Sequence, residues 1–336
     1  MDHIVIGSVT RQADGNYQVE FRLIDILKAK QVLGYSFSAT DKTLRGVAHQ
    51  ISDYIFTHIT GLPGAFSTRI AYVTLKQDKA SYSARLQVSD TDGYNPQTLL
   101  TSDQPIMSPA WSPDGSELAY VSFESGQAEI FTHNILTGVR KSRSKFKGLN
   151  GSPAWSPDGK KLVMTLSKDG NPDIYVLNLS DNKLKRITNH WSIDTEAAWL
   201  PDGKSIVYTS SRSGKPQLYK QAISTNAKPE RLTYEGNYNA SASVSADGKS
   251  IAYVHGEGNI YRIAVLELAT KSSRVLTDGP LDESPVYAPN NSMILFASQE
   301  KNQAVLAAVS VDGRQKQRLA FTDGEVREPS WAPVRH

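Results

Sequence analysis

Ser108-Pro109-Ala110-Trp111-Ser112-Pro113-Asp114-Gly115 is the stretch that decides the fold, because it recurs along the chain. Five further copies, some of them degenerate, begin at Ser152, Glu196, Ser241, Ser284 and Glu328. Successive copies begin 43 to 45 residues apart. A period in the low forties is typical of one blade of a β-propeller, a ring of four-stranded sheets around a central channel.

Each repeat carries signals for four antiparallel strands. The Pro-Asp-Gly corner predicts a hairpin turn, because Pro fixes φ and Gly accepts a positive φ. A run of β-branched and aromatic residues such as Leu118–Val121 follows as the second strand. Third and fourth strands are expected at segments such as Asp173–Leu177 and Lys185–Thr188. We expect the copies of Trp111 to pack between neighbouring blades.

The order of the strand signals predicts how the ring closes. The run Ile70–Val73 has no first strand before it, and the copy at Glu328 has no second strand after it. We therefore expect a mainly β fold, a six-bladed β-propeller whose C-terminal strand completes the first blade. The other three strands of that blade would come from residues near 69–103, and no open edge would remain between the first and last blades.

Residues 1–64 do not carry the repeat and predict a small, partial α/β domain, followed by the propeller over 65–336. Asp41 is expected to N-cap a helix that ends at Gly61 and Pro63. One apolar face of this helix comprises Leu44, Val47, Ala48, Ile51, Tyr54 and Ile55. Strands are expected at His3–Val9, Tyr17–Ile24 and Gln31–Phe37.

Composition narrows the functional class. The chain has 336 residues, a net charge of +3 and dispersed basic residues, so a nucleic-acid surface is not indicated. It has no cysteine and no apolar run long enough to span a membrane. The first residues are not a signal peptide, and because they open directly into a strand-like run we expect an upstream piece to be missing.

The sequence contains none of the common catalytic motifs. H-E-x-x-H, G-x-S-x-G and phosphate-binding glycine patterns are absent, and the seven histidines are scattered. The Asp-Gly pairs are expected to be turns and not metal ligands. We therefore predict a binding scaffold with no catalytic residues, no cofactor and no metal site.

Propeller geometry limits where a partner can bind. The loops that lead into the inner strands, here called the mouth loops, share one end of the channel with the loops that join second and third strands. We predict that a partner contacts residues in and after the mouth loops, namely Pro105, Met107, Leu149, Asn150, Thr195, Glu196, Asn239, Asp282, Glu283, Arg327 and Glu328.

The chemistry of this mouth suits a peptide or a protein loop. Met107, Leu149 and Tyr238 offer apolar contact, while amides and a hydroxyl nearby offer hydrogen bonds. An acidic collar would favour a basic or amide-rich partner or a calcium ion, although such residues are also common in solvated loops. The collar consists of Asp194, Glu196, Asp282, Glu283 and Glu328.

The chain as a whole resembles the TolB family, the periplasmic propeller proteins of the bacterial Tol–Pal envelope system. The similarity combines the N-terminal domain with blades of the SPAWSPDG type. Its more specific stretches are Arg69–Val73, Val88–Asn95, Pro105–Gly115 and Phe123–Gly126.

The resemblance implies a periplasmic protein that binds the peptidoglycan-associated lipoprotein Pal at one mouth of the channel. Pro105, Leu149, Ser152 and Thr195 fall where the Pal-binding surface of the family is expected. Outer-membrane integrity and cell division depend on the system. Family members also contact TolA through an extreme N-terminal segment, which is absent from this sequence, so that contact transfers to no residue here.

Two other functional classes remain as alternatives. The chain could be the regulatory propeller of a peptidase that lacks its catalytic domain, which the neighbouring coding sequence would reveal. It could also be a channel-mouth enzyme that uses the acidic cluster and bound calcium on a sugar or lactone, which a metal titration would reveal.

Overall fold

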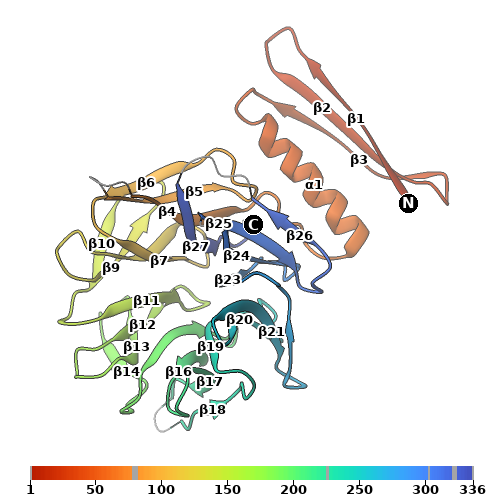
Figure 1. Cartoon of the computed structure of the whole chain (residues 1–336). Helices are drawn as coiled ribbons and strands as arrows, with labels where there is room; N and C mark the ends of the chain where they lie inside the picture. Colours follow the sequence, from red (N-terminus) through yellow and green to blue (C-terminus); the bar gives the residue numbers. More distant parts are fainter. Residues whose placement is uncertain (1, 78–81, 225–226, 302, 320–323, 335–336) are drawn as a thin grey trace. The chain divides into compact units, whose positions relative to one another are not determined.

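The computed structural model describes residues 2–77, 82–224, 227–301, 303–319 and 324–334 (Figure 1). The chain divides into two compact units, Met1–Ser67 and Thr68–His336. Among the described residues no helix is both long enough and apolar enough to cross a membrane.

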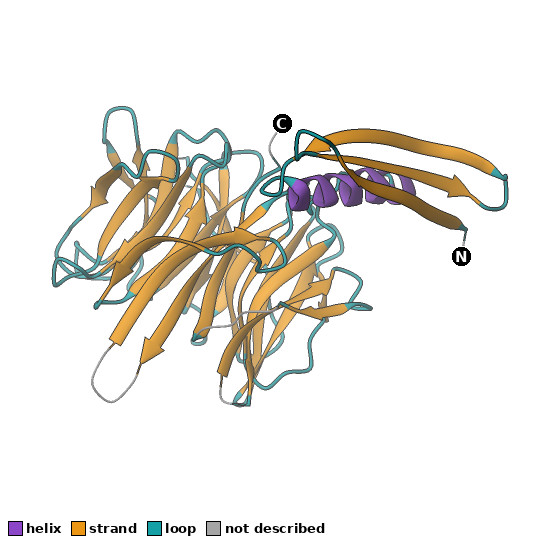
Figure 2. Cartoon of the chain, turned by 90° about the horizontal axis from the view of Figure 1, so that it is seen from above, coloured by secondary structure: helices purple, strands orange, loops and turns teal. Residues whose placement is uncertain are grey.

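The N-terminal unit is an antiparallel sheet in the order β1-β2-β3 with one helix packed on it. The strands are β1 (His3–Arg11), β2 (Tyr17–Asp25) and β3 (Lys30–Ala39), and the helix is α1 (Leu44–Thr60). The helix contacts β2 and β3, and Figure 2 shows the helix lying along this small sheet. Side chains of both strands and of α1 form the small core, which buries Val19, Ala39 and Val47.

The two ends of α1 differ in how well the sequence predicts them. Gly61 terminates the helix in a left-handed conformation, with φ of 74°, and donates its N–H to the Thr57 carbonyl, which confirms the predicted end. The predicted N-cap, Asp41, is wrong. The helix begins after Thr43, which makes no side-chain cap bond. The Asp41 carboxylate instead accepts a hydrogen bond from the Tyr17 hydroxyl, which raises the pKa of Tyr17.

The segment that follows α1 is hydrogen-bonded to the helix. Asp53 accepts hydrogen bonds from the backbone N–H groups of Phe66 and Ser67, at 2.7 and 3.1 Å. A side chain at Gly64 would overlap the Asp53 backbone, since a Cβ there would lie 2.4 Å from the Asp53 Cα. Glycine is therefore required for this close approach, and the N-terminal unit extends to Ser67.

The described residues of the second unit form six four-stranded antiparallel sheets, as expected for propeller blades. Five sheets are continuous in the chain, with strand order equal or opposite to chain order. Their strands are β7 (Ile106–Trp111), β8 (Glu117–Ser122), β9 (Glu129–Asn134), β10 (Arg140–Ser144); β11 (Asn150–Trp155), β12 (Lys161–Leu166), β13 (Asp173–Asn178), β14 (Leu184–Arg186); β15 (Asp194–Trp199), β16 (Ser205–Ser210), β17 (Gln217–Ala222), β18 (Glu230–Arg231); β19 (Tyr238–Val244), β20 (Ser250–Glu257), β21 (Ile260–Glu267), β22 (Ser272–Val275); β23 (Asp282–Tyr287), β24 (Met293–Glu300), β25 (Gln303–Ser310) and β26 (Lys316–Arg318).

The remaining sheet joins the two ends of the unit. Its order is β27-β4-β5-β6, so the last strand of the chain pairs with the first strand of the unit. Trp331 lies opposite Ile70 in this antiparallel pairing. The strands of this sheet are β4 (Arg69–Gln77), β5 (Tyr82–Asp90), β6 (Gln97–Ser102) and β27 (Glu325–Trp331).

The inner strands of the six sheets are neighbours of one another. Each inner strand contacts the next one, in the order β7, β11, β15, β19, β23 and β27, and β27 in turn contacts β7 (Figure 1). The repeated tryptophans lie at these seams. The Trp155 indole N–H donates to the Ala110 carbonyl of the preceding sheet, and Trp199 donates likewise to Ala154. Their expected packing between neighbouring sheets is confirmed.

Different sets of turns lie at the two ends of the inner strands. At one end, the turns between third and fourth strands bond to the Pro-Asp-Gly corners, as Ile135 N–H does to Ser116 O. At the other end, the mouth loops bond to the turns between second and third strands, as Ser167 N–H does to Leu149 O. The predicted mouth loops therefore share one rim with these turns.

Candidate partner-binding face at the channel mouth

A ring of left-handed residues lines the channel just inside this rim. Each inner strand pairs with its neighbour through a register shift, and one residue of each shift has a φ between 46° and 54°. Such a φ is uncommon outside glycine. The six residues are Ser108, Ser152, Glu196, Ser241, Ser284 and Glu328. All six line a channel cavity of about 750 Å³.

Two members of the ring are acidic, and each reaches the next sheet. Glu196 accepts the backbone N–H of Ser241 at 3.0 Å and the Thr209 hydroxyl at 3.2 Å. Glu328 accepts the backbone N–H of Ser108, across the seam between β27 and β7. These carboxylates therefore hold neighbouring inner strands together as well as charging the channel.

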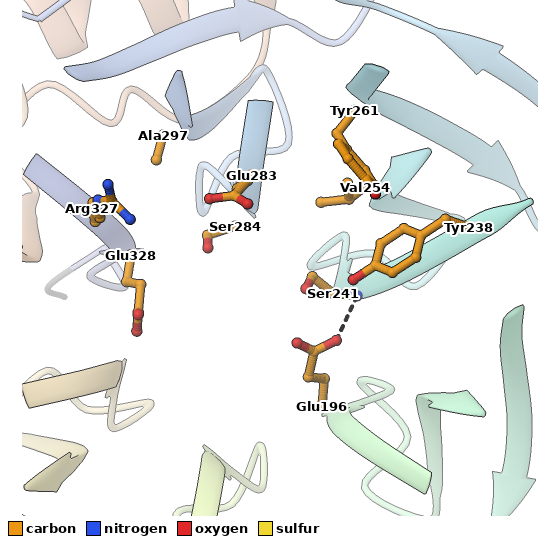
Figure 3. A pocket seen from close by; sticks show the side chains of 10 residues that line it. All are labelled: Glu196, Tyr238, Ser241, Val254, Tyr261, Glu283, Ser284, Ala297, Arg327 and Glu328. Carbon is orange, nitrogen blue, oxygen red and sulfur yellow. Dashed lines mark hydrogen bonds between the residues drawn. The ribbon is translucent and has the colours of Figure 1, made fainter. Parts of the chain in front are cut away.

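A pocket of about 410 Å³ opens at the mouth above the acidic side of the ring. The carboxylates of Glu196 and Glu328 point into the space between the strands, as Figure 3 shows. Glu283 and Arg327, both exposed, also line it. A pair of tyrosines closes one wall, with ring centroids 5.3 Å apart in an edge-to-face arrangement, and this pair is Tyr238 and Tyr261.

The pocket shifts the ionisation of its own groups. Burial raises the pKa of Glu328, and the nearby carboxylates of Glu283 and Glu196 raise it further. Burial also raises the pKa of Tyr238 to about 12, so its hydroxyl stays neutral and can donate a hydrogen bond. The pocket thus offers negative charge beside phenolic donors, which suits a cationic or amide group.

Three predicted contact residues have buried side chains that shape the loops. Asn150 accepts the Phe146 N–H at 3.0 Å and donates to the Phe146 carbonyl at 2.7 Å. Asn239 bonds the Glu235 carbonyl at 2.7 Å and the His255 ring at 2.8 Å.

The third buried residue, Asp282, belongs to the expected acidic collar. It accepts the Ser298 hydroxyl at 2.6 Å. Asp194, also in that collar, is buried and paired with Arg212 at 2.7 Å. The acidic surface is therefore smaller than the sequence suggested, since Asp194 and Asp282 do not face solvent. Glu283 is exposed, and Glu196 and Glu328 are half-buried.

The other predicted contact residues lie along the mouth at varied depth. Met107 and Leu149 are exposed, each with about two fifths of its surface free. Pro105, Ser152 and Thr195 are half-buried. All three follow or end a mouth loop, so the structure brings them to the same rim as the pocket.

Sequence reasoning missed two features of this face. The left-handed conformation of the ring could not be recognised from residue type, because its positions are serine and glutamate, which occur in many backbone conformations. Trp191 was missed for another reason, although it is the one tryptophan of five outside the repeat position and has 79% of its surface exposed. An unexplained tryptophan in a polar loop was the available signal.

Comparison with known families matches both units. The family model described as the TolB beta propeller domain matches residues 56–335, and the model described as the TolB amino-terminal domain matches residues 1–32.

Individual relatives match nearly the whole chain. A Tol-Pal system protein TolB of Xanthomonas campestris pv. campestris (strain B100) is 58% identical, and one of Xanthomonas oryzae pv. oryzae (strain MAFF 311018) is 59% identical. Both alignments cover 99% of this chain and 76% of the relative. The crystal structure of TolB from Acinetobacter baumannii superposes with a TM-score of 0.93 at 43% identity, over 99% of this chain and 84% of that one.

Proposed function

The chain belongs to the TolB family of Tol–Pal system proteins, and we propose that it binds the lipoprotein Pal at the mouth of its propeller channel. Members of this family are scaffold proteins with a β-propeller and are not enzymes, and the same holds for this chain. One observation carries the proposal: the similarity to a Tol-Pal system protein TolB, at 58% identity, extends over 99% of the chain.

We further propose that the six four-stranded sheets are the six blades of one closed ring. The pairing of β27 with β4 and the contact of β27 with β7 support closure at the seam between the chain ends. Closure matters for function because it brings mouth loops from distant parts of the chain to one rim. We also propose the domain division predicted from the sequence, residues 1–64 and 65–336, with Gly61–Gly64 as the joint between the two domains.

In this proposal the mouth contacts Pal through residues of unlike character. Met107 and Leu149 supply apolar contact, and the half-buried Thr195 supplies a hydroxyl. The exposed Glu283 and Arg327 supply charge. Pro105 and Ser152 shape the floor of the face, and Glu196 and Glu328 line the pocket. The buried Asn150, Asn239 and Asp282 act indirectly, by holding the loops in place.

The cellular role follows from the family. TolB proteins of Tol–Pal systems are periplasmic, and we place this chain in the periplasm as a peripheral component that supports outer-membrane integrity and cell division. Its other partners would belong to the same system, TolA among them.

The proposal is tested by titrating the full chain with a soluble Pal domain in a calorimeter. We expect saturable binding, and Glu283→Lys should weaken it about tenfold, or ~1.4 kcal/mol, because a charge at the face is reversed. Glu267→Lys is the matched control, since Glu267 is exposed and lies at the other end of the channel, beside the bond from Leu268 N–H to Lys249 O. Absence of heat and of NMR shift changes at micromolar concentrations would refute Pal binding.

A further inference from the structure

Four large apolar side chains are exposed on two of the mouth loops, the loop that leads into β11 and the loop that leads into β15. Their exposed fractions are 39% for Phe146, 41% for Leu149, 79% for Trp191 and 51% for Ile193. We call these four residues the apolar patch. Contiguous exposed apolar surface with a polar surround marks interaction sites on soluble proteins.

Hydrogen bonds bring the two loops of the patch to the same turn, residues 167–172 between β12 and β13. Leu149 donates its N–H to the Ser167 hydroxyl at 2.7 Å. From the other side, the Asn171 amide donates to the carbonyls of His190 and Ser192, at 2.8 and 2.7 Å. Both loops of the patch therefore border this turn, although its members lie up to 47 residues apart in sequence, from 146 to 193.

Hydrogen bonds hold the backbone of both patch loops before any partner arrives. The buried Asn150 amide binds both backbone groups of Phe146. Ile193 exchanges bonds with Ser211, through the Ser211 hydroxyl at 3.2 Å and the Ser211 N–H at 3.1 Å. A preordered surface loses little conformational entropy on binding, so its apolar area converts efficiently into affinity.

Two lysines lie beside the Phe146 side of the patch. Lys147 is exposed between Phe146 and Leu149, and the Lys168 ammonium lies 5.7 Å from the centre of the Phe146 ring. Asp169 is the nearby acidic group, and it pairs with Lys168 at 2.8 Å. The glutamate pocket on the other side of the mouth carries the opposite charge, so the mouth has two chemically unlike halves.

We propose that the apolar patch, centred on Trp191, is the anchor of the partner interface. It seats an aliphatic or aromatic side chain of the partner that is flanked by acidic residues, while a basic or amide group of the same partner faces the glutamate pocket. Exposed tryptophans are typical centres of binding energy in interfaces. The two unlike halves then fix the partner in one orientation. This inference rests on the proposed binding of Pal at the mouth.

The test is calorimetric titration of the full chain and its variants with the soluble Pal domain. Trp191→Ala should weaken binding about 30-fold or more, as for a central interface tryptophan. Because Trp191 is mostly exposed, its removal should leave the unfolding temperature unchanged. Leu136→Ala is the matched control: Leu136 is 81% exposed and lies at the opposite end, next to the bond between Ile135 N–H and Ser116 O. It should leave binding within twofold.

A second pair of variants tests the charge. Lys147→Glu should weaken binding about threefold to tenfold and reduce its sensitivity to salt. Lys160→Glu is its control, because Lys160 is exposed at the opposite end, where its carbonyl accepts the Leu179 N–H.

The outcomes separate this inference from the proposed function. If Pal binds the unaltered chain but binds the Trp191 and Lys147 variants equally well, the anchor is refuted and the Pal proposal stands. If Pal does not bind the unaltered chain, both are refuted. If phosphatidylglycerol vesicles sediment with the unaltered chain, and Trp191→Ala abolishes this without affecting Pal binding, the patch is a lipid surface and the inference is overturned.

Discussion

Glu328 holds a carboxylate at the seam between the last strand of the chain and β7. Its acceptance of the Ser108 N–H favours the ionised form, as does Arg327 beside it. Burial has the larger, opposite effect, and Glu283 and Glu196 add repulsion, so the pKa of Glu328 is raised overall. The acceptor of the hydrogen bond at this seam is therefore a carboxyl group that is harder to ionise in the folded chain than in the unfolded chain.

This raised pKa sets a direction for the pH dependence of stability. The folded chain binds the Glu328 proton more tightly than the unfolded chain, so this contribution to stability is full below the unfolded pKa of about 4.3 and is lost as pH rises through the folded pKa. Glu328→Gln keeps an acceptor oxygen without the charge. We expect it to raise the unfolding temperature by about 2 °C at pH 7.5 and to have no effect at pH 4, measured by calorimetry.

Glu257→Gln serves as the control, because Glu257 is an exposed glutamate at the end of β20. It should leave the unfolding temperature unchanged at both pH values. A Glu328→Gln chain that is less stable than the unaltered chain at pH 7.5 would mean that the hydrogen bond to Ser108 outweighs the cost of the buried charge.

At the scale of single elements, the sequence predicted the strands well because their signals are local. The Pro-Asp-Gly corners and the β-branched runs lie within a few residues of one another, as at Ser112–Val121. The left-handed ring could not be predicted, since the φ of Ser108 or Ser152 is imposed by register shifts against the neighbouring strand. The patch also depends on tertiary contacts, because its two loops both hydrogen-bond to the turn at 167–172.

The difference between local sequence signals and tertiary contacts also explains why the predicted contact residues differ in role. Polarity alone made Asn150 and Asn239 plausible contacts for a partner, but their amides are occupied by backbone groups of their own loops and by the ring of His255. Sequence pattern identifies which residues stand near the mouth. It does not distinguish a side chain that faces solvent from one that supports the loop, because both are polar and both lie next to a strand.

The helix α1 offers a matched test of backbone conformation with two glycines. Gly61 has a φ of 74° at the helix end, whereas Gly46 lies within the helix, and neither has an atom within 4 Å of an added Cβ. Gly61→Ala should destabilise the N-terminal unit by about 1–2 kcal/mol, because alanine resists the left-handed conformation.

The second substitution, Gly46→Ala, should stabilise the same unit by about 0.5–1 kcal/mol, because alanine loses less backbone entropy in a helix. Both changes can be followed by ellipticity at 222 nm in urea, since α1 is the helix of the described chain. Equal effects of the two substitutions would contradict this account of the helix end.

At the scale of the whole molecule, the fold depends on a pairing between the chain ends of the propeller unit. The other five sheets each use one continuous segment, but the sheet of β4 requires β27 from the far end of the chain. The position of Arg327 and Glu328 at the mouth depends on this pairing, because β27 carries both residues and Glu328 accepts the Ser108 N–H across the seam to β7. Among the described residues this pairing joins positions 250 to 261 residues apart, so forming it has a large entropic cost.

An engineered disulfide measures that closure directly, because the chain has no cysteine of its own. Glu325 and Leu75 are register partners across β27 and β4. A disulfide between cysteines at these two positions closes a loop of about 250 residues and should stabilise the chain by about 5.5 kcal/mol, raising the unfolding temperature by about 10 °C. Cysteines at Lys76 and Ser83, partners across β4 and β5, close a loop of about 8 residues and should add about 2.5 kcal/mol, or ~5 °C. The difference should disappear on reduction with dithiothreitol. If the first pair stays reduced under oxidising dialysis, or forms only intermolecular dimers, β27 does not pair with β4 in solution and the ring is open.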